Sequence, residues 1–445
     1  MNRRFKPAVL LLSGALAATL LAQTLHAQSV SRRRIPGISA QDAALHELLV
    51  QAKAAADKQD YATAEAAYLK YLAQKPNDAP AHFDLGFVYT AQHRKDNAEA
   101  EYRKAIALDP KMTEAYLNLG VSLLADDPKT ALEPLEQVTK LNYSYAKGHY
   151  LLGAARERSG ELQKAIEEYN VAEKLDPNDF ETHLALGHAL LYYTNSLLPL
   201  AAAESEFREA LKLKGDNAEA EMGLAQSLAA QKKNADAATA LGNYLNEKPN
   251  DMKARMMRAS LLVDMDKDDE ALEELDRVAK DQAETPDGLK LRSLIYYREK
   301  KYDQTAAVLQ KAEALAPQDA EIRARLGHVL LQLKNYPAAT RELNEAFRLD
   351  TTATETLRDL VAAEYLSEDY PATLAAMNVL EQRETPKPGA WFVRATCYDH
   401  MGQAAAALEA YQKFLALNTD KNSNQYFEAA ARVRFLEKEL KDKGK

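Results

Sequence analysis

The sequence predicts an all-α protein built as a solenoid of antiparallel helix pairs. Its composition suits such a fold, because 47% of the 445 residues are hydrophobic, 28% are charged, and only 16 Gly and 16 Pro occur. Apolar residues recur at helical spacing through most of the chain. A turn also recurs at a nearly constant interval, which is typical of repeat proteins.

The repeating element is clearest in Ala79–Met112, where two apolar helical runs flank a polar turn. Pro110 ends the second run, because proline has no N–H to donate and clashes with the preceding turn. Gly86 and Ala98 are small enough to let two helices approach closely, and Tyr102 fills the space beside them. The segment therefore predicts an antiparallel helix pair with one buried seam.

The turn after this helix pair has equivalents along the chain. Eight of the ten successive intervals are 34 residues long, and the other two, of 33 and 38 residues, change length within predicted turns. The equivalent residues are Pro76, Pro110, Tyr143, Pro177, Gly215, Pro249, Ala283, Pro317, Thr351, Thr385 and Thr419. Such a period predicts repeats that each pack against their neighbours.

With this period, the chain resembles the tetratricopeptide repeat family over about Leu45–Lys421. The family's small eighth residue is present as Ala52, Gly86, Gly120, Gly153, Gly187, Ala225, Ala259, Gly327 and Ala395. The twentieth-place alanine is present as Ala64, Ala98, Ala131, Ala165, Ala203, Ala237, Ala271, Ala339 and Ala407. The twenty-fourth-place aromatic is present as Tyr68, Tyr102, Tyr169, Phe207 and Tyr411, and the fourth-place tryptophan once, as Trp391.

The closest helix crossings are expected at a subset of these positions: Gly86, Ala98, Gly120, Gly153, Ala165, Gly187, Gly327 and Ala407. Several residues depart from the family pattern, among them Arg258, Arg292 and Arg394 at the usually apolar seventh place. Ser293 and Val361 replace the small eighth residue, and Thr305 and Thr373 replace the twentieth alanine. Their repeats are expected to pack less tightly.

The resemblance implies a right-handed superhelix of about eleven repeats, with the first helices lining a concave groove. The repeats start near residues 45, 79, 113, 146, 180, 218, 252, 286, 320, 354 and 388. The fifth repeat has four extra residues within Leu191–Ala202, which either form a binding loop or pack over their neighbours. Residues 422–445 are amphipathic and predict a capping helix with a polar outer face, followed by a short tail.

In the family, the second, fifth, ninth, twelfth and thirteenth places of each repeat face the groove. Large side chains at these places are candidates for holding an extended peptide or a partner helix. They are Phe83, Phe87, Tyr150, Glu157, His188, Tyr192, Lys290, Tyr297, Arg298, His328, Tyr365, Phe392 and His400. The alternative is that these side chains pack against adjacent first helices.

Met1–Ala27 has the pattern of a secretory signal peptide, with Arg3, Arg4 and Lys6 before an apolar run that is too short to span a bilayer comfortably. The alternative is an uncleaved membrane anchor. No cysteine directly follows the apolar run, so a lipoprotein is not expected. Gln28–Gln41 is expected to be a flexible lead-in. The protein is therefore expected to be exported and to be periplasmic or secreted, without a membrane span after cleavage.

Composition and motifs exclude several classes of function. Loss of the signal's three basic residues takes the net charge from −9 to −12, which argues against binding to nucleic acid or an anionic membrane. His183 and His188 are five residues apart, so they do not share a helix face as two metal ligands would. No catalytic, cofactor-binding or metal-binding residue is predicted. The single cysteine, Cys397, is expected to be buried, the alternative being a reactive thiol.

The sequence thus predicts a non-catalytic scaffold or adaptor of the bacterial envelope that binds a protein or peptide in the groove. A narrower alternative is an accessory subunit of an export or assembly machine, for an outer-membrane component or an exopolysaccharide. An enzyme or carbohydrate-binding protein on the same scaffold is disfavoured, because the repeats occupy nearly the whole chain. The identity of the partner and the oligomeric state are left open.

Overall fold

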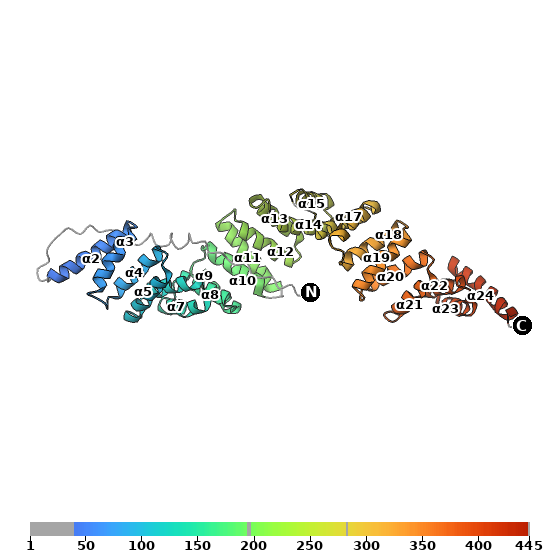
Figure 1. Ribbon diagram of the computed structural model, residues 1–445, viewed down its shortest axis with the longest axis horizontal. Helices are drawn as coiled ribbons and strands as arrows, with labels where there is room; N and C mark the ends of the chain where they lie inside the picture. The colour runs from blue at the N-terminus through green and yellow to red at the C-terminus, as the bar shows by residue number, and fades with distance from the viewer. Residues whose placement is uncertain (1–39, 194–196, 282–283, 444–445) are drawn as a thin grey trace. The chain divides into compact units, whose positions relative to one another are not determined.

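The computed structural model describes residues 40–193, 197–281 and 284–443, and all regular structure in these ranges is α-helical (Figure 1). Each first helix of a repeat packs along the second helix of the same repeat. The predicted all-α fold of consecutive helix pairs is confirmed. The predicted signal peptide, residues 1–27, lies outside the described residues, as does the lead-in up to residue 39.

The chain separates into two compact units, Met1–Leu141 (unit 1) and Asn142–Lys445 (unit 2). The helices of unit 1 are α2 (Ala40–Asp57), α3 (Tyr61–Leu72), α4 (Ala79–Ala91), α5 (Lys95–Leu108), α6 (Thr113–Leu124) and α7 (Pro128–Leu141). Unit 2 begins with α8 (Ala146–Arg158), α9 (Leu162–Leu175), α10 (Phe180–Tyr193), α11 (Leu197–Leu213), α12 (Ala218–Ala230), α13 (Asn234–Glu247), α14 (Met252–Asp264) and α15 (Asp268–Asp281). It continues with α16 (Pro286–Arg298), α17 (Tyr302–Leu315), α18 (Ala320–Gln332), α19 (Tyr336–Leu349), α20 (Thr354–Leu366), α21 (Tyr370–Glu381), α22 (Pro388–His400), α23 (Ala404–Leu417) and α24 (Asn424–Lys443).

Most first helices are followed by a residue with a left-handed backbone conformation, which always stands at the fifteenth place of the repeat. This residue has positive φ in nine repeats: Gln59, His93, Gly160, Lys232, Asp266, Lys300, Lys334, Glu368 and Gly402. In the second repeat the next amide, from Arg94, reaches back to the Tyr89 carbonyl at 2.9 Å, and the other eight repeats have the same bond. This is the Schellman ending, which reverses the chain after a helix.

The helices of a pair meet at the small eighth residue. A Cβ atom on Gly86 would lie 2.7 Å from the Tyr102 ring, and one on Gly187 would lie 2.9 Å from the Phe207 ring. Gly120 and Gly327 are in the same position opposite leucines. The twentieth-place alanines beside these contacts, Ala98, Ala165 and Ala407 among them, are almost completely buried. In these pairs a large side chain of the second helix fills the space that the small residue of the first helix leaves open.

The extra residues of the fifth repeat are largely helical. They lie at the end of α10 and in α11, with residues 194–196 outside the described chain. Leu200 of α11 is buried, whereas Tyr192 and Tyr193 of α10 are exposed. The insertion therefore contributes both to packing and to an exposed aromatic surface.

Candidate functional site

The first helices of unit 2 form one side of that unit, which we call the first-helix face. Contacts join α8 to α10, α10 to α12, α14 to α16, and α18 to α20. In the described chain no second helix makes a comparable contact with the next second helix. Side chains on the first-helix face are therefore closest to one another from repeat to repeat, and most of the predicted groove residues lie on this face.

At the start of the face, Tyr150 of α8 is buried rather than open to a partner. Its ring lies 6.0 Å from that of Tyr169, and the Lys147 ammonium lies 4.0 Å above it in a cation–π contact. Burial lowers the pKa of Lys147. The expectation that Tyr150 is an exposed anchor is corrected: the α9 aromatic that closes the repeat also covers it.

A second group joins α8, α10 and α12. Glu157 accepts a hydrogen bond of 2.7 Å from the Tyr169 hydroxyl, and burial raises the pKa of this carboxyl group. His188 lies with Nε2 3.5 Å from the Glu219 carboxylate, and its ring stacks on that of Tyr192 at 6.5 Å. Tyr192 is half exposed. It is thus the aromatic of this group that a partner can reach.

Further along the face, a pocket of about 220 Å³ opens between α16, α17 and α18. Its lining is mostly apolar, with polar groups from two predicted groove residues, Tyr297 and His328. The lining residues are Ser293, Leu294, Tyr297, Thr305, Leu309, Arg325, His328 and Val329. The structure therefore brings these two candidates together at a hollow in the surface.

The pocket lies in a repeat that departs from the family pattern at both of its small places, the eighth and the twentieth. Leu309 stands at the twenty-fourth place, where five other repeats carry Tyr or Phe and several others, like this one, carry leucine. Ser293 stands at the eighth place and donates a hydrogen bond of 2.7 Å to the Lys290 carbonyl of its own helix. Ser293, Thr305 and Leu309 together border the hollow, and Leu309 is smaller than the aromatic ring of those five repeats.

Tyr297, His328 and Asp359 form a hydrogen-bonded row across α16, α18 and α20. His328 Nδ1 lies 2.7 Å from the Asp359 carboxylate, and Nε2 lies 2.9 Å from the Tyr297 hydroxyl. The carboxylate only accepts, so Nδ1 carries a proton and Nε2 of the neutral ring accepts from the tyrosine. The bond to Asp359 raises the pKa of His328. The row fixes both rings at the pocket's rim.

The cations beside the pocket already have partners. Lys290 lies 3.1 Å from Asp287 and 3.4 Å from Asp319, and Arg325 lies 2.7 Å from Glu321. Arg298, also a predicted groove residue, donates to the Val263 carbonyl and to the carboxylates of Asp266 and Asp268 in the preceding repeat. These side chains give a polar rim without a net positive patch.

The remaining candidates are distributed between the two units. In unit 2 Tyr365 contacts Tyr370, whose ring stacks on that of His400 at 4.7 Å. Phe392 is buried, with its ring 5.2 Å from that of Phe414, so it is a core residue and not a partner contact. In unit 1 the two candidates on α4, Phe83 and Phe87, are half-buried.

A recurrent ion pair was not anticipated from the sequence. In five repeats the fourth residue is His or Arg, and it bonds both to a glutamate of the second helix and to a backbone carbonyl before the repeat. For His82 these distances are 2.5 Å to Glu101 and 2.9 Å to the Pro76 carbonyl. The other pairs are His149–Glu168, His183–Glu206, Arg255–Glu274 and Arg323–Glu342. The signal was present, as a basic fourth residue with glutamate on the following helix.

In the described chain, the pair of His183 and Glu206 lies close enough to Glu173 for the three side chains to be candidate metal ligands. Both nitrogens of His183 are already hydrogen-bonded, at 2.7 Å to Glu206 and at 2.9 Å to the Pro177 carbonyl. Burial opposes the charged imidazole, but these two bonds outweigh it and raise the pKa of His183. The histidine therefore serves the helix pair and has no nitrogen free for a metal ion.

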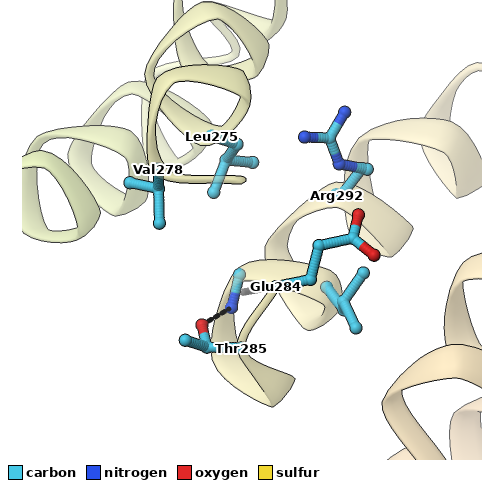
Figure 2. A pocket seen from close by; sticks show the side chains of 7 residues that line it. Leu275, Val278, Glu284, Thr285 and Arg292 are labelled. Carbon is cyan, nitrogen blue, oxygen red and sulfur yellow. Dashed lines mark hydrogen bonds between the residues drawn. The ribbon is translucent and has the colours of Figure 1, made fainter. Parts of the chain in front are cut away.

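A second pocket lies between α15 and the start of α16, and Figure 2 shows it from close by. Its volume is only about 10 Å³, room for at most one water molecule. Thr285 caps α16 here by accepting a hydrogen bond from the Gly288 amide at 3.2 Å.

Cys397 of α22 is a core residue and not a reactive thiol. Its side chain is fully buried, and burial raises the pKa of the thiol to about 11.

Comparison with protein families agrees with this architecture. Sequence models described as tetratricopeptide repeat match residues 49–113, 186–251, 256–320, 296–363 and 388–421, and one described as TPR repeat matches residues 158–191. The chain belongs to the tetratricopeptide repeat family. Repeat proteins of this kind present extended surfaces for binding other proteins.

Solved structures with related folds include YrrB, described as a TPR protein with an unusual peptide-binding site, at 21% identity over 42% of this chain and 95% of that one, with a TM-score of 0.39. PilF of Pseudomonas aeruginosa is 17% identical over 48% of this chain and 96% of its own (TM-score 0.39). Yeast Tom70 is 12% identical over 90% and 97% (TM-score 0.35). The search of curated proteins gives no significant match. Among the described helices, none has the length and apolar character needed to cross a bilayer.

Proposed function

We propose that the protein is a non-catalytic scaffold that binds an extended segment of a partner protein along the first-helix face of unit 2. The observation that carries the proposal is the pocket beside Tyr297 and His328. It is the point on this face where an apolar hollow and hydrogen-bonding groups meet.

The size and lining of the pocket favour a side chain as its occupant. Its volume of about 220 Å³ is below the range of roughly 300–1,000 Å³ that is usual for small-molecule sites. Leu294, Leu309 and Val329 would surround an apolar group, and the Tyr297 hydroxyl and His328 ring at the rim could bond the partner's backbone. A large aliphatic or aromatic residue in an extended peptide meets these requirements.

Tyr192, in the exposed end of α10, is proposed as a second contact. Its ring is half exposed and is held by stacking on His188. Exposed tyrosines with a fixed orientation are common anchors at interfaces, because little side-chain entropy is lost on binding. Two aromatic contacts on different repeats would select for the length of the bound segment.

We further propose that the protein acts in the bacterial envelope after cleavage of residues 1–27. The charged start and short apolar run of this segment support export. Amino-terminal sequencing of the protein from its source cells tests this, with Gln28 expected as the first residue. Detection of the intact Met1 sequence on the membrane-bound protein would instead support an uncleaved anchor.

Site-specific photo-crosslinking tests the binding face. Benzoylphenylalanine is placed at Arg325, on the pocket's rim, or at Leu315, which is exposed at the end of second helix α17. An adduct is expected only from position 325. The Ser293→Gly/Leu309→Phe substitution, made in the same chain, is expected to abolish it by filling the pocket. Equal adducts from both positions would contradict the proposed face.

A further inference from the structure

The last helix, α24, is attached to the protein by one side only. Ala429 and Leu436 are buried against the preceding repeat, and Val433 packs beside them. Arg432 forms a bidentate pair with Asp399 of α22, at 2.7 and 2.5 Å. These contacts hold α24 in a fixed orientation and define which of its faces points outward.

The outward face is not the uniformly polar surface expected of a terminal helix. Phe427 and Phe435 are 60% and 55% exposed, and Ala431 between them is also exposed. Residues four apart lie one turn apart on the same face, so these three form an apolar row. Glu428 and Arg434 are exposed beside the row, and neither forms an ion pair with another described residue.

The arrangement of these side chains is symmetric about Ala431. Phe427 precedes Ala431 by four residues and Phe435 follows it by four; Glu428 precedes it by three and Arg434 follows it by three. If two copies of the helix lie antiparallel and cross at Ala431, each Phe427 meets the Phe435 of the other copy. Each Glu428 then meets the other copy's Arg434.

We propose that two copies of this chain associate through an antiparallel pairing of α24 about a two-fold axis near Ala431. Such an interface is isologous, because the same residues are used on both sides. The small side chain of Ala431 lets the helix axes approach at the crossing. A parallel pairing is disfavoured, because it would place Glu428 against Glu428 and Arg434 against Arg434.

The interface is a single helix face, since α24 has 20 residues and a length of about 30 Å. It would bury less than the roughly 1,200–2,000 Å² of a standard interface, so a reversible, concentration-dependent dimer is expected. The proposal does not depend on the partner-binding site, which involves α16 to α18. Failure of either one leaves the other intact.

Sedimentation equilibrium of the full chain, over about 1–100 µM, tests the pairing. The native chain is expected to change from monomer to dimer in this range. Phe427→Ser/Phe435→Ser is expected to weaken dimerisation at least about tenfold. A native chain that is monomeric throughout, or a dimer that the serine variant leaves unchanged, would overturn the proposal. So would a monomer that binds anionic vesicles through these phenylalanines.

Charge reversal tests the symmetry itself. Glu428→Arg and Arg434→Glu are each expected to weaken the dimer, because each places like charges opposite one another twice. The double variant Glu428→Arg/Arg434→Glu is expected to restore it. Glu437→Arg, exposed on the helix flank, is the control and should leave dimerisation unchanged. Absence of rescue, with a native melting curve for every variant, would overturn the antiparallel pairing.

Discussion

A Cβ atom on Gly153 of α8 would lie 2.7 Å from the ring of Tyr169 on α9. The aromatic ring therefore occupies the space that a side chain at the eighth place would need. Gly86 with Tyr102, and Gly187 with Phe207, show the same relationship. The repeat with Ser293 and Leu309 lacks both the glycine and the aromatic residue of these crossings, and it is the repeat that borders the pocket.

Gly153→Leu should destabilise the protein by roughly 1–3 kcal/mol, because the new side chain overpacks the crossing. The check is a comparison of melting temperatures. Gly389→Leu is a matched control, since nothing lies within 4 Å of a Cβ atom there. If the Gly153 and Gly389 variants melt alike, Gly153 does not lie at a close contact.

Lys300→Gly should stabilise the protein by about 0.5–1 kcal/mol. Lys300 has φ 58°, a conformation that costs an L-residue roughly 1–2 kcal/mol, while glycine adopts it freely at some cost in unfolded-state entropy. Gly402→Ala, at the equivalent place with φ 71°, should have the opposite effect. Denaturant titration measures both changes, and a Lys300→Gly protein less stable than the native one would refute the assignment.

Glu274→Leu should cost about 3–5 kcal/mol, because it leaves the buried Arg255 and the partly buried Arg258 without their common partner. Glu274 is 2% exposed and lies 2.7 Å from Arg255 and 2.5 Å from Arg258, with Arg277 also in contact. Glu273→Leu, at a neighbouring exposed position, should change stability by no more than about 0.5 kcal/mol. Similar melting temperatures for the two variants would contradict the structural role of the recurrent ion pair.

Glu364→Gln should stabilise the protein at pH 8 and much less at pH 4.5. Burial raises the pKa of the Glu364 carboxyl group from 4.5 to about 7. Between these values the unfolded chain loses a proton that the folded chain keeps, so the free energy of unfolding falls as pH rises. Glutamine avoids this cost. The difference in melting temperature between this variant and the native chain should grow as the pH rises from 4.5 to 8, and exposed Glu368→Gln is the control for removal of a nearby carboxylate.

The repeated helix pairs could be predicted because helix period and turn spacing are local features of the sequence. The left-handed residue at the fifteenth place could not, since only Gly160 and Gly402 among nine such residues are glycines. There the conformation is imposed by the helix ending and the packing of the next helix. Propensity alone would not place Lys300 or Glu368 in it.

The candidate site was predictable only in part, because burial depends on neighbours far along the sequence. Tyr150 and Phe392 occupy groove places of the family, yet aromatic side chains of the following second helices cover them. Tyr297 and His328 remain at a pocket, which Leu309 of the following second helix lines without covering them. Ser293 and Thr305 were expected to loosen their repeat, and both line that pocket.

The central claim is that the pocket holds a side chain of a bound protein segment. Its test needs a peptide selected by phage display against the native chain and a variant that fills the pocket without unfolding the repeat. Ser293→Gly/Leu309→Phe serves, because it reproduces the pairing of Gly187 with Phe207 seen in α10 and α11. The variant must also melt at the same temperature as the native chain, which shows that the repeat stays folded.

The decisive measurement is calorimetric titration of that peptide into the native chain and into the Ser293→Gly/Leu309→Phe variant. Loss of a buried anchoring side chain predicts affinity weakened at least about tenfold, a difference of about 1.4 kcal/mol or more. Leu315→Ser, on a second helix, should bind as the native chain does. Equal affinity of the native and pocket-filled chains would contradict the proposed mode of binding.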